Sequence, residues 1–294
     1  MSSLKWTHKS LRKIQQALAA QGLSLSPPTI SRLLEQEDYS LQANRKRLSG
    51  KQYPERDQQF AYIVRWRKAY LQRGWPVISV DVKKAELIGN FKNRGRVWRQ
   101  EPRDVNTYDF LNLAQGKAIP YGIYDIGRNC GFVSVGISHD TAEFAVVAIR
   151  AWWLSVHTTI YAQQRHLLIE ADSGGSNGRR QRRWKVCLQE FANQFGLTIT
   201  VTHFPTGASK WNPIEHRMFS LMSANWAGEP LVDYDTLLNF IRSTTSTTGF
   251  WCDVQLDRHT YQTRIKVSDQ QMAQLSFRYH KRLALWNYTI FPQT

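Results

Sequence analysis

The feature that most constrains the fold is a short β-branched run, Pro-Val-Ile-Ser-Val at residues 76–80, which is followed directly by Asp81. Uncharged runs of this kind predict a buried central strand of a sheet. The sequence pattern changes at this point, because the residues before Trp75 show helical periodicity and include a basic connector. The run therefore marks the start of a new domain.

Strand and helix patterns alternate after this first strand. Residues 119–126 and 132–138 predict an antiparallel hairpin, joined by a loop over 127–131. A helix then begins at Asp140, with Glu143 completing a capping box. The remaining patterns predict a strand, a helix, a strand and a helix, at residues 167–172, 179–195, 197–203 and from Pro213 onward. A meander followed by this alternation is the element order of a ribonuclease-H-like α/β domain, a mixed sheet with flanking helices.

The first quarter of the chain is strongly basic. Residues 1–73 hold 14 Lys and Arg against 5 Asp and Glu, an excess of 9 within a formal net charge of +16 for 294 residues. Such an excess predicts a polyanionic partner. Periodicity predicts a helix over 9–21 that ends at Gly22, and a second helix with Ser26 as its N-cap. The pair predicts a helix-turn-helix, although any helical hairpin in a small bundle shows the same periodicity.

Polar residues of the second helix and of the connector behind it are the candidates for DNA contact. They are Thr29, Ser31, Arg32, Arg45, Lys46 and Arg47. We predict a helix-turn-helix region over 1–52, a connecting helix over 53–75 and a catalytic domain with a C-terminal extension over 76–294. The charges of the connecting helix suit either phosphates or a solvated face.

Three acidic residues stand where predicted elements begin or end. Asp81 closes the first strand, Asp172 closes the strand over 167–172, and Glu215 lies in the first turn of the helix from Pro213. Open α/β sheets place their sites at such strand ends. Carboxylates from separate elements suit Mg²⁺, and two such ions about 4 Å apart support in-line phosphodiester displacement.

Each acid also has a purely structural interpretation. Asp81 suits a turn at a strand end, and Asp172 suits the start of the Gly-rich loop Ser-Gly-Gly-Ser-Asn-Gly. Glu215 suits a capping box in which Asn212 is the N-cap and Pro213 the first helical residue. The joint placement of the three acids beside a basic N-terminal region favours the catalytic interpretation.

Several other classes of protein are excluded. The apolar run at 144–149 is bounded by charges, far short of the roughly 18 residues of a membrane span. The first residues lack the apolar run of a secretory signal, and three scattered cysteines predict neither a disulfide framework nor a zinc finger, so we expect a reducing cytoplasm. The loop after Asp172 lacks the setting of a serine-protease nucleophile, and the chain has no phosphate-binding GxxxxGK[ST] motif.

Several segments together resemble one known family. They include Ser-Val-Asp-Val-Lys-Lys (79–84), Glu-Leu-Ile-Gly-Asn-Phe-Lys (86–92), Gly-Lys-Ala-Ile-Pro-Tyr-Gly (116–122), Ala-Asp-Ser-Gly-Gly-Ser-Asn-Gly (171–178), Ser-Lys-Trp-Asn-Pro-Ile-Glu-His-Arg (209–217), Lys-Val-Ser-Asp (266–269) and Trp-Asn-Tyr (286–288). These blocks resemble the Rhodopirellula-type DDE transposases of bacterial insertion sequences, distant relatives of the Tc/mariner class. The resemblance covers essentially the whole chain.

The resemblance implies a DNA transposase that cuts transposon ends and joins 3′-hydroxyls to target DNA. It implies that Asp81, Asp172 and Glu215 bind two Mg²⁺ ions, with Mn²⁺ able to substitute. The expected partners are the double-stranded DNA of the ends and the target, bound by a homo-oligomer in the bacterial nucleoid. Phosphate contacts near the acids are expected from Lys83, Lys84, Arg179, Arg180, His216 and Arg217.

Two departures from the family pattern bear on these expectations. Val82 stands where many relatives have Thr, and relatives carry further helices before the segment that begins this chain. We therefore expect an N-terminally shortened product with weakened recognition of transposon ends. Two alternatives stay open: a catalytically silent DNA-binding relic that represses transposition, and a general nuclease of the same fold. Metal-dependent cleavage of DNA would distinguish a transposase from the silent relic. Joining of DNA ends would distinguish a transposase from the general nuclease.

Overall fold

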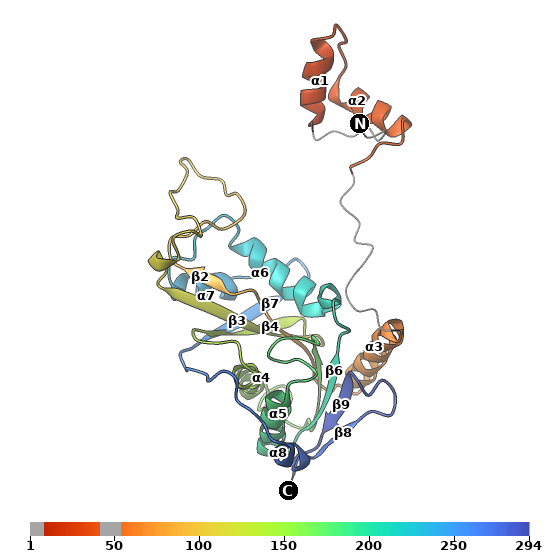
Figure 1. Ribbon diagram of the computed structural model, residues 1–294, viewed down its shortest axis with the longest axis vertical. Helices are drawn as coiled ribbons and strands as arrows, with labels where there is room; N and C mark the ends of the chain where they lie inside the picture. The colour runs from red at the N-terminus through yellow and green to blue at the C-terminus, as the bar shows by residue number, and fades with distance from the viewer. Residues whose placement is uncertain (1–8, 42–53, 294) are drawn as a thin grey trace. The chain divides into compact units, whose positions relative to one another are not determined.

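The computed structural model describes residues 9–41 and 54–293, and it divides into two compact units, 1–49 and 50–294 (Figure 1). In the first unit, α1 (Leu11–Ala19) and α2 (Pro27–Gln36) are the two predicted helices. The Ser26 hydroxyl accepts a hydrogen bond from the backbone NH of Thr29 at 3.3 Å, as expected of an N-cap. Gly22 has a φ of +82°, a left-handed conformation that suits the residue after a helix.

The second unit is built on a mixed sheet. Its central strand, β1 (Val77–Val82), pairs antiparallel with β3 (Gly116–Asp125), which pairs with β4 (Cys130–Gly136). On its other side, β1 pairs parallel with β5 (His166–Ala171), and β5 pairs parallel with β6 (Thr198–His203). The order β4-β3-β1-β5-β6 is the ribonuclease-H-like arrangement that the element order predicts, so the fold class is confirmed.

Further strands extend this sheet at both edges. β7 (Trp251–Asp257) adds parallel to β4. β9 (Asn287–Ile290) adds antiparallel to β6, and β8 (Phe277–Tyr279) pairs with β9. The short β2 (Glu86–Ile88) pairs with the start of β3.

Helices cover both faces of the sheet (Figure 1). On one face, α4 (Ala142–Val156) and α5 (Arg182–Phe195) bury a core that contains Trp153 and Trp184. On the other, the π-helix η3 (Glu215–Phe219) with α6 (Ser220–Asn225) and α7 (Tyr234–Arg242) buries a second core around Met218. The shorter elements are η1 (Leu111–Leu113), η2 (Ser209–Trp211) and α8 (Asp269–Ala273).

The helix predicted as a connection, α3 (Arg56–Gln72), packs on the sheet. Its buried Gln59 donates to the backbone oxygen of His203 and to Oδ1 of Asn287, both at 2.9 Å. Arg67 makes a bidentate ion pair with Glu170 of β5, whose carboxylate is fully buried. These contacts fix α3 to the second unit.

Some local predictions are wrong in detail. Thr141, and not Asp140, is the N-cap of α4, because its hydroxyl accepts from the backbone NH of Phe144 at 3.2 Å. Helical periodicity in α3 also predicts that its apolar Val64 and Leu71 point inward, but they are 56% and 37% exposed. The reason is that α3 contacts the sheet through one narrow stripe, so apolar positions beside that stripe face solvent.

No helix within residues 9–41 and 54–293 is long and apolar enough to cross a membrane.

Candidate active site

The three predicted acids lie at the carboxyl ends of neighbouring elements. Asp81 is the penultimate residue of β1, and Asp172 directly follows β5. Because β1 and β5 are parallel with Val80 paired to Ala171, both aspartates leave the sheet at the same edge. Glu215 is the first residue of η3.

A glycine allows η3 to approach this edge. Gly122 of β3 pairs with Asp81. A Cβ atom at Gly122 would lie 2.6 Å from Cε1 of Phe219 and 2.9 Å from Cδ1 of Ile214, closer than such contacts allow. The packing of η3 over β3, which brings Glu215 toward β1, therefore requires the missing side chain.

The acids act on one another electrostatically. Burial raises the pKa of Asp81 to about 8, with further contributions from the negative charges of Asp172 and Glu215. Burial and the charge of Glu215 raise the pKa of Asp172 to about 6. Burial also raises the pKa of Glu215, against the positive charges of His216 and Lys83. The charges of Asp172 and Glu215 near Asp81 create a region of negative potential, which favours a cation.

The side chain of Asn212 connects the elements that carry the acids. It is fully buried, and its Nδ2 lies 3.5 Å from Oδ1 of Asp172 and 3.4 Å from the backbone oxygen of Val80. Its Oδ1 accepts a hydrogen bond from the Ser79 hydroxyl, which in turn accepts from the backbone NH of Ile214 at 3.2 Å. One amide thus joins β1, the residue after β5 and the turn before Glu215.

These contacts exclude the capping-box interpretation of Glu215. Asn212 directs its side-chain amide to the strands, and the backbone NH of Glu215 donates to the backbone oxygen of Asn212 at 3.1 Å and not to its side chain. The hydroxyl of Ser79, a residue of β1, instead satisfies an NH group of the first helical turn. The Glu215 carboxylate is therefore available for a role other than capping.

Two further buried residues support the same edge. Asn177, in the Gly-rich loop, directs its Nδ2 to the backbone oxygen of Val80 at 3.5 Å. His203, at the end of β6, has Nδ1 at 2.9 Å from the backbone oxygen of Asp172, and burial lowers its pKa to about 3. Sequence reasoning missed Asn177, Asn212 and His203. The sequence offered one signal for each: Asn177 lies within the Gly-rich loop, Asn212 lies shortly before Glu215, and His203 lies at a strand end.

Asp140 is a fourth carboxyl group near the site. Sequence reasoning took it for a helix cap, but its negative charge contributes to the raised pKa of Asp81. Burial raises the pKa of Tyr121, and the charges of Asp81 and Asp140 raise it further; the Tyr121 hydroxyl has no hydrogen-bond partner within the described part of the chain. The acidic character of this edge therefore extends beyond the three predicted residues.

The donor set fits a hard divalent cation in its chemistry. Carboxylate oxygens from three elements are the ligands that Mg²⁺ prefers, and Mg²⁺ takes its other ligands from water and phosphate. Over residues 9–41 and 54–293, no group of three or more His, Cys, Asp or Glu side chains is arranged closely enough to hold a metal by itself. The three acids therefore suit Mg²⁺ by their oxygen atoms and their charge, and not by a complete set of protein ligands around one position.

The predicted phosphate contacts near the acids differ in their surroundings. Lys83 forms an ion pair with Glu86 at 2.6 Å and lies over the ring of Trp226, so part of its charge is already compensated. His216 has Nε2 in contact with the backbone oxygen of Lys210. The remaining side chains are half-buried or exposed: Lys84, Arg179, Arg180 and Arg217.

The predicted DNA contacts in the first unit also differ in their surroundings. Arg32 is exposed on α2. Thr29 and Ser31 are half-buried and direct their hydroxyls to Ser26 and Glu35 within the same unit. Arg45, Lys46 and Arg47 lie outside the described residues.

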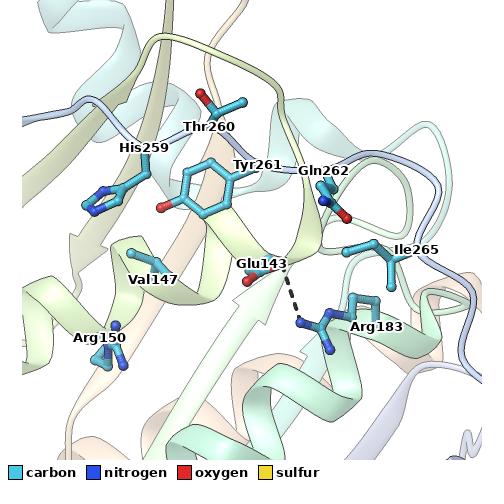
Figure 2. Close-up of a pocket in the computed structure, with 9 residues that line it drawn as sticks. All are labelled: Glu143, Val147, Arg150, Arg183, His259, Thr260, Tyr261, Gln262 and Ile265. Atoms are coloured by element: carbon cyan, nitrogen blue, oxygen red, sulfur yellow. Dashed lines mark ion pairs between the residues drawn. The ribbon is translucent and has the colours of Figure 1, made fainter.

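A pocket of about 530 Å³ lies away from these acids, between α4, α5 and the segment 259–265 (Figure 2). An ion pair between Glu143 and Arg183, at 3.3 Å, spans two of its walls (Figure 2). None of the predicted site residues lines it. The carboxyl edge of the sheet is therefore the better candidate for chemistry.

Comparison with known proteins gives a family and a set of solved structures. A family model described as Rhodopirellula transposase DDE domain matches residues 1–292. No curated protein matches the chain. The solved structures include the Mos1 transposase paired-end complex with the left transposon end, at 13% sequence identity and a TM-score of 0.46, covering 82% of this chain and 72% of that one. Mos1 mariner paired-end complexes with Mn and with Mg have 12% and 11% identity, each with a TM-score of 0.47 and the same coverage.

Proposed function

The chain belongs to the family of the Rhodopirellula transposase DDE domain, and from this membership we propose that it is the transposase of an insertion sequence. In this proposal the protein cuts the ends of its element and joins the freed 3′-hydroxyls to target DNA. It acts as a homo-oligomer on DNA, since two ends must be held for joining.

The observation that carries the assignment of the site is the placement of three partly buried carboxylates at one edge of the sheet. Burial raises the pKa of Asp81, and the charges of Asp172 and Glu215 raise it further; burial and then the charge of Glu215 raise the pKa of Asp172. Repulsion of this kind destabilises the ionised site when it is empty and is relieved by divalent cations. We assign Asp81, Asp172 and Glu215 as the ligands of two Mg²⁺ ions, with Mn²⁺ as a substitute.

Bound metal would supply activation of the attacking oxygen and stabilisation of the leaving oxygen in phosphodiester displacement. The chain's own residues orient the ligands. The backbone NH of Val82 donates to Oδ1 of Asp81 at 2.8 Å, which fixes the rotation of that carboxylate. Asn212 restrains Asp172 in the same way. Lys84, Arg179, Arg180 and Arg217 would bind DNA phosphates around the site, with smaller contributions from Lys83 and His216.

The test is Mg²⁺-dependent cleavage and joining of a duplex that carries the end of the element. Asp81→Asn, Asp172→Asn and Glu215→Gln should each lower nicking by orders of magnitude, because an amide lacks the charge that the metal requires. Glu190→Gln, an exposed acid on α5, is the matched control and should cut like the parent.

Each alternative has its own outcome. Equal cutting by the parent and the three variants would refute the assignment of these ligands. A parent that binds DNA but never cuts would favour the silent relic, and a parent that cuts without joining ends would favour the general nuclease.

A further inference from the structure

A second feature suited to nucleic acid lies along α3. A pocket of about 450 Å³ is formed by one side of α3, by Trp75 just before β1 and by residues 281 and 282 between β8 and β9. None of the three proposed metal ligands lines it. We call it the α3 pocket.

The rim of the α3 pocket is cationic and lacks carboxylates. Four exposed basic residues line it, and no acidic residue does: Arg65, Arg73, Lys281 and Arg282. Within the described part of the chain, none of the four is ion-paired. Four like charges around one cavity repel one another, so a polyanion that enters it is favoured.

The walls of the α3 pocket are aromatic and held in place. Trp66 lies 5.1 Å from the ring of His280, whose Nδ1 is 2.9 Å from the hydroxyl of Tyr62. Trp75 stacks on His166 at 4.0 Å, and the guanidinium of Arg73 lies 5.3 Å from the centroid of the Trp75 ring. Fixed rings lose little conformational freedom when a ligand binds, so these walls are preorganised for a flat group.

The combination identifies the chemistry of the ligand. Aromatic walls with a cationic rim are the arrangement that binds unpaired nucleotides, by base stacking and phosphate contact. The volume falls in the range of about 300–1,000 Å³ that accommodates small ligands, whereas a duplex is too wide to enter. We propose that the α3 pocket binds an unpaired nucleotide of single-stranded DNA, separately from the carboxylate site.

The test measures anisotropy of a labelled oligothymidine of about 12 nucleotides, in EDTA so that no metal chemistry contributes. The double variant Arg65→Gln/Arg282→Gln should weaken single-strand binding about tenfold or more at physiological salt. It should also reduce the log–log salt slope by about 1.4, because each lost phosphate contact on a single strand removes about 0.7. Lys68→Gln/Lys117→Gln removes the same charge at exposed positions outside the pocket and is the matched control.

A second variant tests the aromatic wall. Trp66→Leu should weaken single-strand binding about tenfold without changing the salt slope, and Trp66→Phe should restore much of the affinity. Thermal unfolding verifies that each variant is folded. Arg65 and Arg282 are exposed, so the charge variant decides the question even if Trp66→Leu does not fold.

Two outcomes would overturn the proposal: equal loss of affinity in the pocket variant and its control, or equal loss for single-stranded and duplex DNA. The inference rests on the proposed function only in taking DNA as the polyanion. A failure of the proposed function can be distinguished from a failure of the pocket proposal, because a parent that never cuts DNA with Mg²⁺ can still show pocket-dependent binding in EDTA.

Discussion

The side-chain amide of Asn212 lies 3.5 Å from the carboxylate of Asp172, and the same fully buried side chain contacts the backbone of β1 beside Asp81. The residue that precedes the turn to Glu215 therefore restrains the other two acids. Asn212 therefore links the elements whose positions set the spacing of Asp81, Asp172 and Glu215.

Replacing Asn212 by Ala should damage both stability and catalysis. The change leaves the Ser79 hydroxyl and the backbone oxygen of Val80 with fewer partners in a buried setting, at a cost of about 1–3 kcal/mol in the free energy of unfolding. It also releases Asp172, so the Mg²⁺ concentration for half-maximal cleavage should rise. Urea unfolding and a Mg²⁺ titration of nicking measure the two effects. Asn239→Ala, at an exposed position of α7, is the control, and an unchanged Mg²⁺ requirement in Asn212→Ala would refute the positioning role.

The contribution of Asp81 and Asp172 to the stability of the metal-free protein should fall as the pH rises. The pKa values of Asp81 and Asp172 are raised to about 8 and about 6, so the folded state holds these protons more tightly than the unfolded chain, whose carboxyl pKa values lie near 4. The stabilisation is complete below about pH 4 and is lost as the pH rises through these two values.

Thermal unfolding in EDTA between about pH 5 and pH 8 measures this dependence. Buried His203, whose pKa is lowered to about 3, makes stability rise with pH up to about pH 6.5 in every variant, so the parent is compared with Asp81→Asn, which shares that group. Relative to Asp81→Asn, the parent should lose Tm as the pH rises across the interval. Addition of Mg²⁺ at the upper pH should raise the Tm of the parent, because a bound cation replaces the missing protons. The same pH profile in the parent and in Asp81→Asn would contradict the raised pKa of Asp81.

Gly122→Ala should disturb the contact that brings η3 over β3. The new methyl group would meet Phe219 and Ile214 at 2.6 and 2.9 Å, which forces one of the two elements to move. We expect a loss of about 1–3 kcal/mol in unfolding free energy and a lower cleavage rate, because Glu215 moves with η3. Gly174→Ala is the control, since a Cβ there meets no atom within 4 Å. Equal stability of the two variants by urea unfolding would contradict the close packing.

Duplex DNA binding by the full chain should depend strongly on salt. With roughly five phosphates neutralised, the log–log slope of affinity against salt should be about −4 to −5. Arg32→Gln, at an exposed position of α2, should make the slope less negative by about 0.9. Fluorescence anisotropy across a salt series measures both values. An unchanged slope would remove Arg32 from the set of phosphate contacts.

The sequence by itself determined the order of the elements and the positions of the acids along them. The run before Asp81 is short, uncharged and β-branched, which favours a buried strand, and the resulting strand is central in the sheet. Asp172 and Glu215 were found because strand ends and helix starts are local features, visible within a few residues. The assignment of all three as metal ligands stays a prediction.

Only the tertiary structure decided which side chains support those acids. Asn212 has the local pattern of an N-cap, yet its amide binds β1, whose Ser79 lies 133 positions away in the chain. Asp140 has the pattern of a cap as well, yet Thr141 takes that role and Asp140 is left near Asp81. Local patterns cannot distinguish these outcomes, because a polar side chain bonds the nearest free partner in space. The raised pKa of Asp81 has the same origin, since burial and the charges of Asp172 and Glu215 exist only once the strands have paired.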